Sequence, residues 1–118
     1  MTTPQYQVWV HTGSQPLAGT DSNVYIMLYG TQGRTDWILL PAEDAFAFEE
    51  NAVDKFLLDL PDLGDPTRVC LSHDESVDSG WYVNNVRIEG SDGRTWTFTF
   101  NSWIGEEEAG RRVVCADV

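Results

Sequence analysis

The chain has 118 residues, of which 42% are apolar and 22% charged, a composition typical of one folded domain and too apolar for intrinsic disorder. Nineteen acidic against seven basic side chains give a formal net charge of -12, which excludes a general nucleic-acid binder because such proteins need clustered Lys and Arg. The same charge repels an anionic lipid surface unless bound cations offset it locally.

Segments rich in β-branched and aromatic residues recur along the chain, and apolar and polar positions alternate within them. In the first half, this alternation predicts strands over Tyr6–His11, Val24–Tyr29 and Asp36–Leu40. A fourth apolar stripe runs from Phe56 to Leu60, and Glu43–Asn51 is compatible with one helical turn.

The second half continues the pattern after a loop that Pro61, Gly64 and Pro66 predict. The alternation slips by one residue around Asn84 and Asn85, which predicts a β-bulge. Gly90–Gly93 supplies the residues of a hairpin turn. The predicted strands are Arg68–His73, Trp81–Glu89, Arg94–Phe100 and Arg112–Ala116.

About eight short strands without a convincing helix predict an all-β fold, a sandwich or a barrel, because each half-apolar sheet must cover its face with another sheet. The sequence contains no internal repeat, linker or low-complexity tract. We therefore expect a single domain over residues 1–118, with its core at about residues 6–116.

Cys70 and Cys115 each lie in a predicted strand. Their spacing is not that of a zinc finger, and two cysteines are too few for a disulfide-stapled secreted scaffold. This pattern favours two free thiols in the core, although sequence spacing leaves a disulfide open.

The N-terminal residues Met-Thr-Thr-Pro contain no basic stretch followed by an apolar one, and no apolar run in the sequence, Trp37–Leu40 included, is long enough to span a membrane. The sequence therefore predicts neither a signal peptide nor a transmembrane helix. We expect a cytoplasmic, monomeric protein that can associate with a membrane only peripherally.

Six motifs in fixed order carry a further signal. They are Thr12–Ile26, Phe48-Glu49 with Asp54-Lys55-Phe56, Asp62-Leu63-Gly64, His73-Asp74, Gly80-Trp81-Tyr82-Val83 with Val86-Arg87-Ile88, and Asn101-Ser102-Trp103-Ile104. Together they resemble PLAT domains, a family named for polycystin, lipoxygenase and alpha-toxin, over Tyr6–Val113. The resemblance implies an antiparallel β-sandwich of about eight strands in two four-stranded sheets, acting as a docking module without a catalytic domain.

The resemblance also implies Ca²⁺ as a ligand, one or two ions per chain. In PLAT domains, the loop that matches Gly19, Thr20 and Asp21 supplies calcium with backbone carbonyls and an Asp carboxylate, ligands that this ion prefers. Asp21 is therefore the leading candidate ligand. The alternative is an Asx turn, in which Asp21 bonds nearby backbone amides and no metal is present.

Two further loops are implied to complete the calcium site. Relatives carry a polar pair just before the Phe-Glu motif, and Phe46-Ala47 replaces that pair here, which weakens the site. Asp44 and Glu49 are near enough in sequence to substitute as ligands. Asp78, just before the Gly80-Trp81 motif, is the candidate from the third loop.

Membrane-docking PLAT domains expose apolar or aromatic side chains at loop tips, where an indole ring suits the water–lipid interface. Pro16 and Leu17 occupy the tip of the first loop here, and Trp103 is predicted to be partly exposed. These three residues are the candidate membrane or partner contacts. The remaining tryptophans are predicted to pack within the fold: Trp9, Trp37, Trp81 and Trp96.

Two functions stay open from the sequence. In the first, loop-bound calcium carries the chain to a membrane lipid surface or a protein partner. In the second, the chain is a protein-interaction domain with no functional calcium or lipid binding. An enzyme is not expected, because no motif joins His11 or His73 to a nucleophile or to metal ligands.

Overall fold

The computed structural model describes residues 5–14, 23–40, 49, 51–60, 62–73, 81–90, 92–104 and 113–117. All regular elements in these residues are strands. The described part of the chain therefore contains no helix long and apolar enough to cross a membrane. The strands are β1 (Gln5–Thr12), β2 (Val24–Gly30), β3 (Gly33–Arg34), β4 (Ile38–Leu40), β5 (Val53–Asp59), β6 (Pro66–His73), β7 (Trp81–Glu89), β8 (Thr95–Ile104) and β9 (Val113–Asp117).

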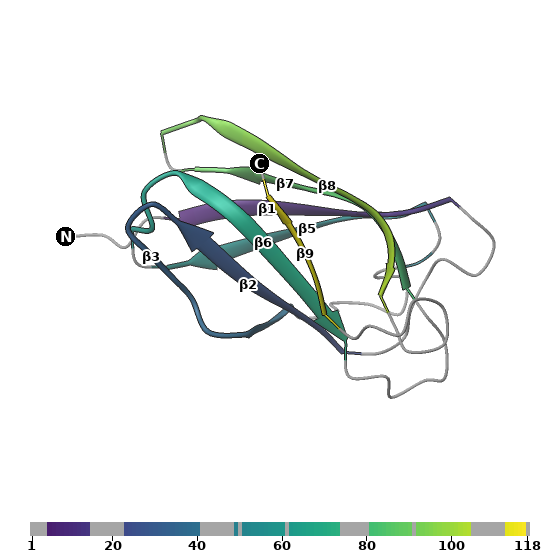
Figure 1. The fold of residues 1–118 in the computed structure, drawn as a ribbon. Helices are drawn as coiled ribbons and strands as arrows, with labels where there is room; N and C mark the ends of the chain where they lie inside the picture. The colour runs from purple at the N-terminus through teal and green to yellow at the C-terminus, as the bar shows by residue number, and fades with distance from the viewer. Residues whose placement is uncertain are drawn as a thin grey trace.

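The strands form two sheets that pack face to face (Figure 1). Sheet A has four strands in the order β5-β1-β7-β8, and sheet B has five, with β3-β2-β6-β9 in a row and β4 also on β2. Every pairing is antiparallel. The predicted antiparallel β-sandwich is confirmed.

Sheet B has a fifth strand because its outer edge is broken in two. Since β6 pairs with the full length of β2 on one side, β3 and β4 share the other side. Thr35 lies between them and holds the break in place, since its N–H donates to the Leu28 carbonyl at 2.9 Å and its hydroxyl accepts from the Leu28 N–H at 3.1 Å. The two-residue strand β3 was not predicted from the sequence.

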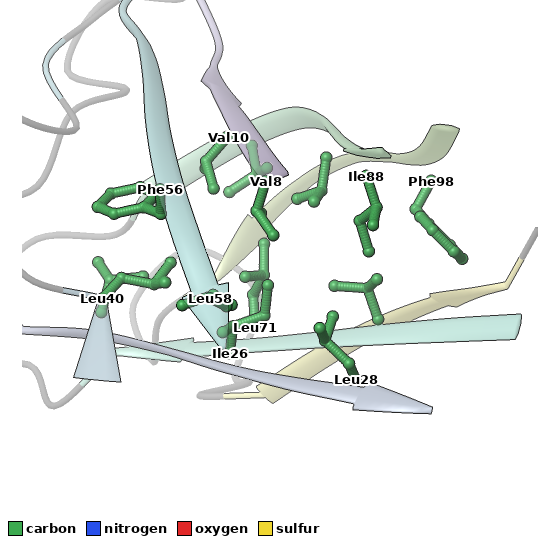
Figure 2. Close-up of a cluster of buried hydrophobic side chains, with 14 of the residues drawn as sticks. Val8, Val10, Ile26, Leu28, Leu40, Phe56, Leu58, Leu71, Ile88 and Phe98 are labelled. Carbon is green, nitrogen blue, oxygen red and sulfur yellow. The ribbon is translucent and has the colours of Figure 1, made fainter. Parts of the chain in front are cut away.

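The core lies between the sheets and follows the period-two alternation that the sequence shows (Figure 2). Val8 and Val10 of β1 are fully buried from sheet A, and Ile26 and Leu71 face them from sheet B. Other inward side chains are Leu28, Phe56, Leu58, Val69, Val86, Ile88 and Phe98.

The predicted bulge in β7 is confirmed. The register of β7 against β8 shifts between Val83 and Asn85, so that Val83 and Val86 both face the core although they are three residues apart. The hairpin that follows is also confirmed, because Gly93 adopts a φ of 87° and donates to the Gly90 carbonyl. Strand β8 continues beyond Phe100 to Ile104.

The prediction of two free core thiols is wrong. Cys70 and Cys115 are direct cross-strand partners in β6 and β9 and form a disulfide, with their Cα atoms 4.0 Å apart. Cys70 is buried, but on the side of β6 opposite Val69 and Leu71, and Cys115 is exposed. The register of two strands 45 residues apart is set by tertiary pairing, which local spacing does not contain.

One prediction for a tryptophan is confirmed and another is wrong. Trp81 is fully buried, as expected for a core residue, whereas Trp37 is 41% exposed, so its predicted packing is wrong. Trp37 lies in the break between β3 and β4, where no ladder fixes the direction of the side chain. The helical turn predicted over 43–51 falls outside the described residues except at Glu49 and Asn51.

Candidate functional site

One end of the sandwich gathers the ends of eight strands. We call it the loop end: β1, β4, β6 and β8 finish there, and β2, β5, β7 and β9 begin there. In Figure 1 it is the right-hand end. The chain between β1 and β2, between β4 and β5, and between β6 and β7 therefore leaves from and returns to this end. These three connections contain every predicted calcium ligand.

Backbone hydrogen bonds fix the first and second of these connections to each other at their bases. Asn51 donates its N–H to the Gly13 carbonyl at 2.8 Å, and Thr12 donates to the Ala52 carbonyl at 3.0 Å. Gly13 also donates to the Tyr82 carbonyl at the start of β7. Asn51 has a φ of 61°, a left-handed conformation that Asn tolerates better than most residues.

A buried polar contact supports the same region from below. The indole N–H of Trp81 donates to the Thr12 hydroxyl at 3.0 Å, and both side chains are completely buried. The bond pairs a buried donor with a buried acceptor, so the two residues fix the start of β7 against the end of β1.

His73 joins the two sheets at this end. Its Nε2 lies within hydrogen-bond distance of the Ile104 carbonyl, and only 2% of the residue is exposed. Because a carbonyl oxygen only accepts, Nε2 carries the proton and donates. The contact therefore connects the end of β6 to the end of β8.

Of the predicted calcium ligands, Glu49 alone is described. It is exposed, and its backbone carbonyl accepts from the Ala52 N–H at 2.9 Å. The other candidates, Gly19, Thr20, Asp21, Asp44 and Asp78, lie outside the described residues. Within the part of the chain that the structure describes, no three His, Cys, Asp or Glu residues cluster closely enough to hold a metal ion.

Of the three predicted contact residues, Trp103 is described, and Pro16 and Leu17 lie outside the described residues. Trp103 is partly exposed, and its ring meets that of its cross-strand partner Tyr82 edge to face, with centroids 5.2 Å apart. One β7–β8 aromatic pair therefore lies near the loop end on the outer side of sheet A.

A second feature of the same outer side was not predicted from the sequence. Trp9 of β1 is only partly buried, and its ring lies beneath two cations, with Lys55 Nζ 5.3 Å and the Arg87 guanidinium carbon 4.3 Å from the centroid. The alternation already put Trp9 on the face opposite Val8 and Val10. That signal could have identified Trp9 as a surface residue.

The opposite end of the sandwich holds a polar cleft of about 500 Å³. Arg94 lies in it between two carboxylates, at 2.7 Å from Asp65 and 2.7 Å from Asp92. The Arg94 backbone N–H and side chain both donate to Asp92, which lowers the pKa of that carboxyl. Both carboxylates already bind the Arg94 guanidinium, so this cation is not free to bind an anionic ligand, and the loop end is the better candidate site.

Comparison with known proteins gives the chain its relatives. Residues 6–114 match the PLAT/LH2 domain family. The human lipoxygenase homology domain-containing protein 1 is 32% identical over 92% of this chain, and the mouse polycystin-1-like protein 3 is 37% identical over 84% of it. The chain spans 5% of the length of each of these two proteins.

The fold also matches solved structures. The coral 8R-lipoxygenase, in which calcium activates the enzyme via a C2-like domain, superimposes with a TM-score of 0.83 at 28% identity. The match covers 96% of this chain and 16% of the lipoxygenase chain. The match over residues 6–114 and the two relatives above agree with the motifs quoted from the sequence, and the chain belongs to the PLAT/LH2 domain family.

Proposed function

We propose that this chain is a non-catalytic, calcium-binding docking module that attaches to a membrane lipid surface or a protein partner. The observation that supports it is the topology of the loop end, where the connections that contain Asp21, Asp44 with Glu49, and Asp78 all leave from and return to one end of the sandwich. Calcium takes six to eight oxygen ligands, which separate loops can supply jointly.

The calcium part of the proposal draws on a relative as well. In the coral 8R-lipoxygenase, calcium activates the enzyme via a C2-like domain that this chain resembles in fold. A bound divalent ion would offset part of the -12 charge at the loop end, and this would allow an acidic chain to approach anionic lipid. Pro16, Leu17 and Trp103 would then make the contact with lipid or partner.

Isothermal titration of the chain with calcium chloride tests the metal site. We expect saturable binding of one or two ions, and a loss of most of the heat in Asp21→Ala. Asp36→Ala is the matched control, because Asp36 is fully exposed between β3 and β4 and its nearest cation, Arg34, is 3.8 Å away. Identical flat titrations of the wild type and Asp21→Ala would remove calcium from the proposal.

Co-sedimentation with phosphatidylserine vesicles then separates a lipid target from a protein target. Calcium-dependent sedimentation that Asp21→Ala and Leu17→Ser both abolish supports lipid docking. Calcium binding without sedimentation at any calcium concentration supports a protein partner.

The cytoplasmic location expected from the sequence stays a prediction. The Cys70–Cys115 disulfide argues against it, because disulfides persist in oxidising compartments and are rare in the reducing cytosol. Mass spectrometry of the chain purified from its own cells under alkylating conditions would decide the redox state of the pair.

A further inference from the structure

The outer face of sheet A contains a row of side chains that the calcium proposal does not use. Lys55 of β5 and Arg87 of β7 are the direct cross-strand partners of Trp9 in β1, so an aromatic ring lies between two cations. Both charged groups lie over that ring. Because β5 and β7 lie on either side of β1, the backbones of Lys55 and Arg87 are roughly 10 Å apart. A short segment of a ligand could therefore contact both cations.

These two cations differ from the other described basic residues. Arg34, Arg68 and Arg94 each form an ion pair with an Asp within 4.0 Å. Among the described residues, neither Lys55 nor Arg87 has such a carboxylate partner, although the chain has 19 acidic residues. Their charge is therefore available to a ligand.

The neighbouring rows add apolar surface beside the cations. Val53 and Leu57, on the same face of the edge strand β5 as Lys55, are 58% and 57% exposed. His11 pairs with Val53 on the loop-end side of the Lys55–Trp9–Arg87 row. Two acids, Asp59 and Glu89, lie on the opposite side of that row. We name the set Trp9, His11, Val53, Lys55, Leu57 and Arg87 the Trp9 face.

We propose that the Trp9 face binds an acidic, partly apolar segment of a protein partner. The inference rests on the proposed docking function and identifies the chemistry of one partner. Carboxylates of the segment would pair with Lys55 and Arg87, and an apolar side chain between them would pack on Trp9 and Leu57. Trp and Arg are among the residue types that most often dominate the binding energy at protein interfaces.

A protein segment fits this face better than a membrane does. The Trp9 ring is partly buried and contacts both cations, so its insertion into lipid would break these two cation–π contacts. A flat membrane would also bring Asp59 and Glu89 against the anionic surface, whereas a narrow segment can contact the Trp9 row alone. Charge complementarity over a small area favours the segment.

Selection from a displayed library of random dodecapeptides tests the proposal. The full chain is immobilised and the selection is run in EGTA, so that calcium sites do not contribute. We expect the enriched peptides to contain Asp or Glu on both sides of an apolar residue. A synthetic copy of one enriched peptide, and a copy with Gln in place of each acid, are then titrated against the chain by fluorescence anisotropy.

Variants connect the binding to the face. The double variant Lys55→Gln with Arg87→Gln is expected to bind the acidic peptide at least about tenfold more weakly than the wild type. Added salt is expected to weaken binding of the peptide to the wild type. Arg34→Gln is the matched control, because it removes an equally exposed charge from sheet B and is expected to leave the affinity unchanged. Equal melting temperatures show that the variants fold.

Four results would overturn the proposal. They are a selection without acidic enrichment, equal affinity of the double variant, calcium-independent binding to phosphatidylserine vesicles that the double variant loses, and self-association that the double variant abolishes. The last two would assign the face to membranes or to a second copy of the chain. Failure of the calcium titration leaves the inference intact, because the peptide selection is run in EGTA and does not depend on bound calcium.

Discussion

Three buried side chains at the loop end form hydrogen bonds that hold the strand ends next to the candidate loops. Thr12, His73 and Trp81 are buried polar or partly polar residues in a core that is otherwise aliphatic and aromatic. Each has a hydrogen-bond partner on another strand. A buried donor without a partner costs more than a made bond contributes, so these contacts constrain the ends of β1, β6 and β7.

Removal of the Thr12 hydroxyl tests this constraint. Thr12→Val removes the hydroxyl that accepts from the buried Trp81 indole N–H, and we expect a loss of about 1–3 kcal/mol in the free energy of unfolding, measured by urea denaturation. Thr97→Val makes the same change at an exposed position of β8 and is expected to shift stability by about 0.5 kcal/mol or less. Equal losses in both variants would contradict the role of the buried bond.

Residue-scale predictions from the sequence succeeded where alternation alone decides the outcome. Trp81 was expected to pack within the fold and is buried, and the alternation puts Val8 and Val10 on one face of β1, which is the buried face. Trp9 was expected to pack within the fold, but its ring contacts the cations of Lys55 and Arg87 on the outer face of sheet A. These two residues belong to strands far away in the sequence. A single strand pattern gives the face of a residue but not its neighbours on adjacent strands.

At the scale of elements, the edge strand β9 depends on its pairing with β6. Three features hold it there: the backbone ladder, the Cys70–Cys115 disulfide, and the ion pair between Arg68 and Asp117 at 2.6 Å. The disulfide can be reduced, and the ion pair is lost when Asp117 is protonated. Reduction and low pH should therefore weaken β9 before the rest of the sandwich.

Replacement of both cysteines measures the contribution of the disulfide. Cys70→Ala with Cys115→Ala is expected to lower the free energy of unfolding by about 2–4 kcal/mol, because the bond closes a loop of 45 residues in the unfolded chain. Dithiothreitol should lower the urea midpoint of the wild type and leave that of the double variant unchanged. A wild type that does not respond to full reduction would contradict this prediction.

The ion pair predicts a pH dependence. The hydrogen bond from Arg68 lowers the pKa of Asp117 below the ordinary value of about 4. A lowered folded-state pKa means that the pair stabilises β9 above about pH 4 and that this contribution is lost as the pH falls through the lowered value. Carbon-13 NMR titration should give Asp117 a midpoint below the ordinary value. Arg68→Gln should return that midpoint to the ordinary value, and an unchanged midpoint would contradict the assignment.

The elements themselves were largely predictable, because eight of the nine strands in the described residues correspond to segments predicted from the sequence. The exceptions are β3, which has two residues and no pattern of its own, and the extension of β8 to Ile104. Asn101 has a φ of 43° within that extension. The β6–β9 register, and with it the disulfide, depends on tertiary pairing and could not be predicted.

At the scale of the whole molecule, charge and topology decide how the chain can act. A net charge of -12 opposes docking to anionic lipid, and the loop end is where a bound cation would offset that charge. The face of sheet A carries Lys55 and Arg87 without described carboxylate partners and offers a separate, calcium-independent surface. The two surfaces lie on different parts of one sandwich, so they can be tested separately.

The sequence predicted the sandwich and the family from motifs spread over the whole chain. The ligand set at the loop end stays a prediction, because calcium coordination depends on the relative positions of Asp21, Asp44 and Asp78, three residues in separate connections. Spacing in one chain gives no distances between such connections.

A crystal structure of the chain grown in calcium chloride tests the central claim most directly. We expect an ion at the loop end with six to eight oxygen ligands at about 2.3–2.6 Å, including the Asp21 carboxylate and a backbone carbonyl from Gly19 or Thr20. Ordered water alone beside Gly19, Thr20 and Asp21 in such a crystal would contradict the claim.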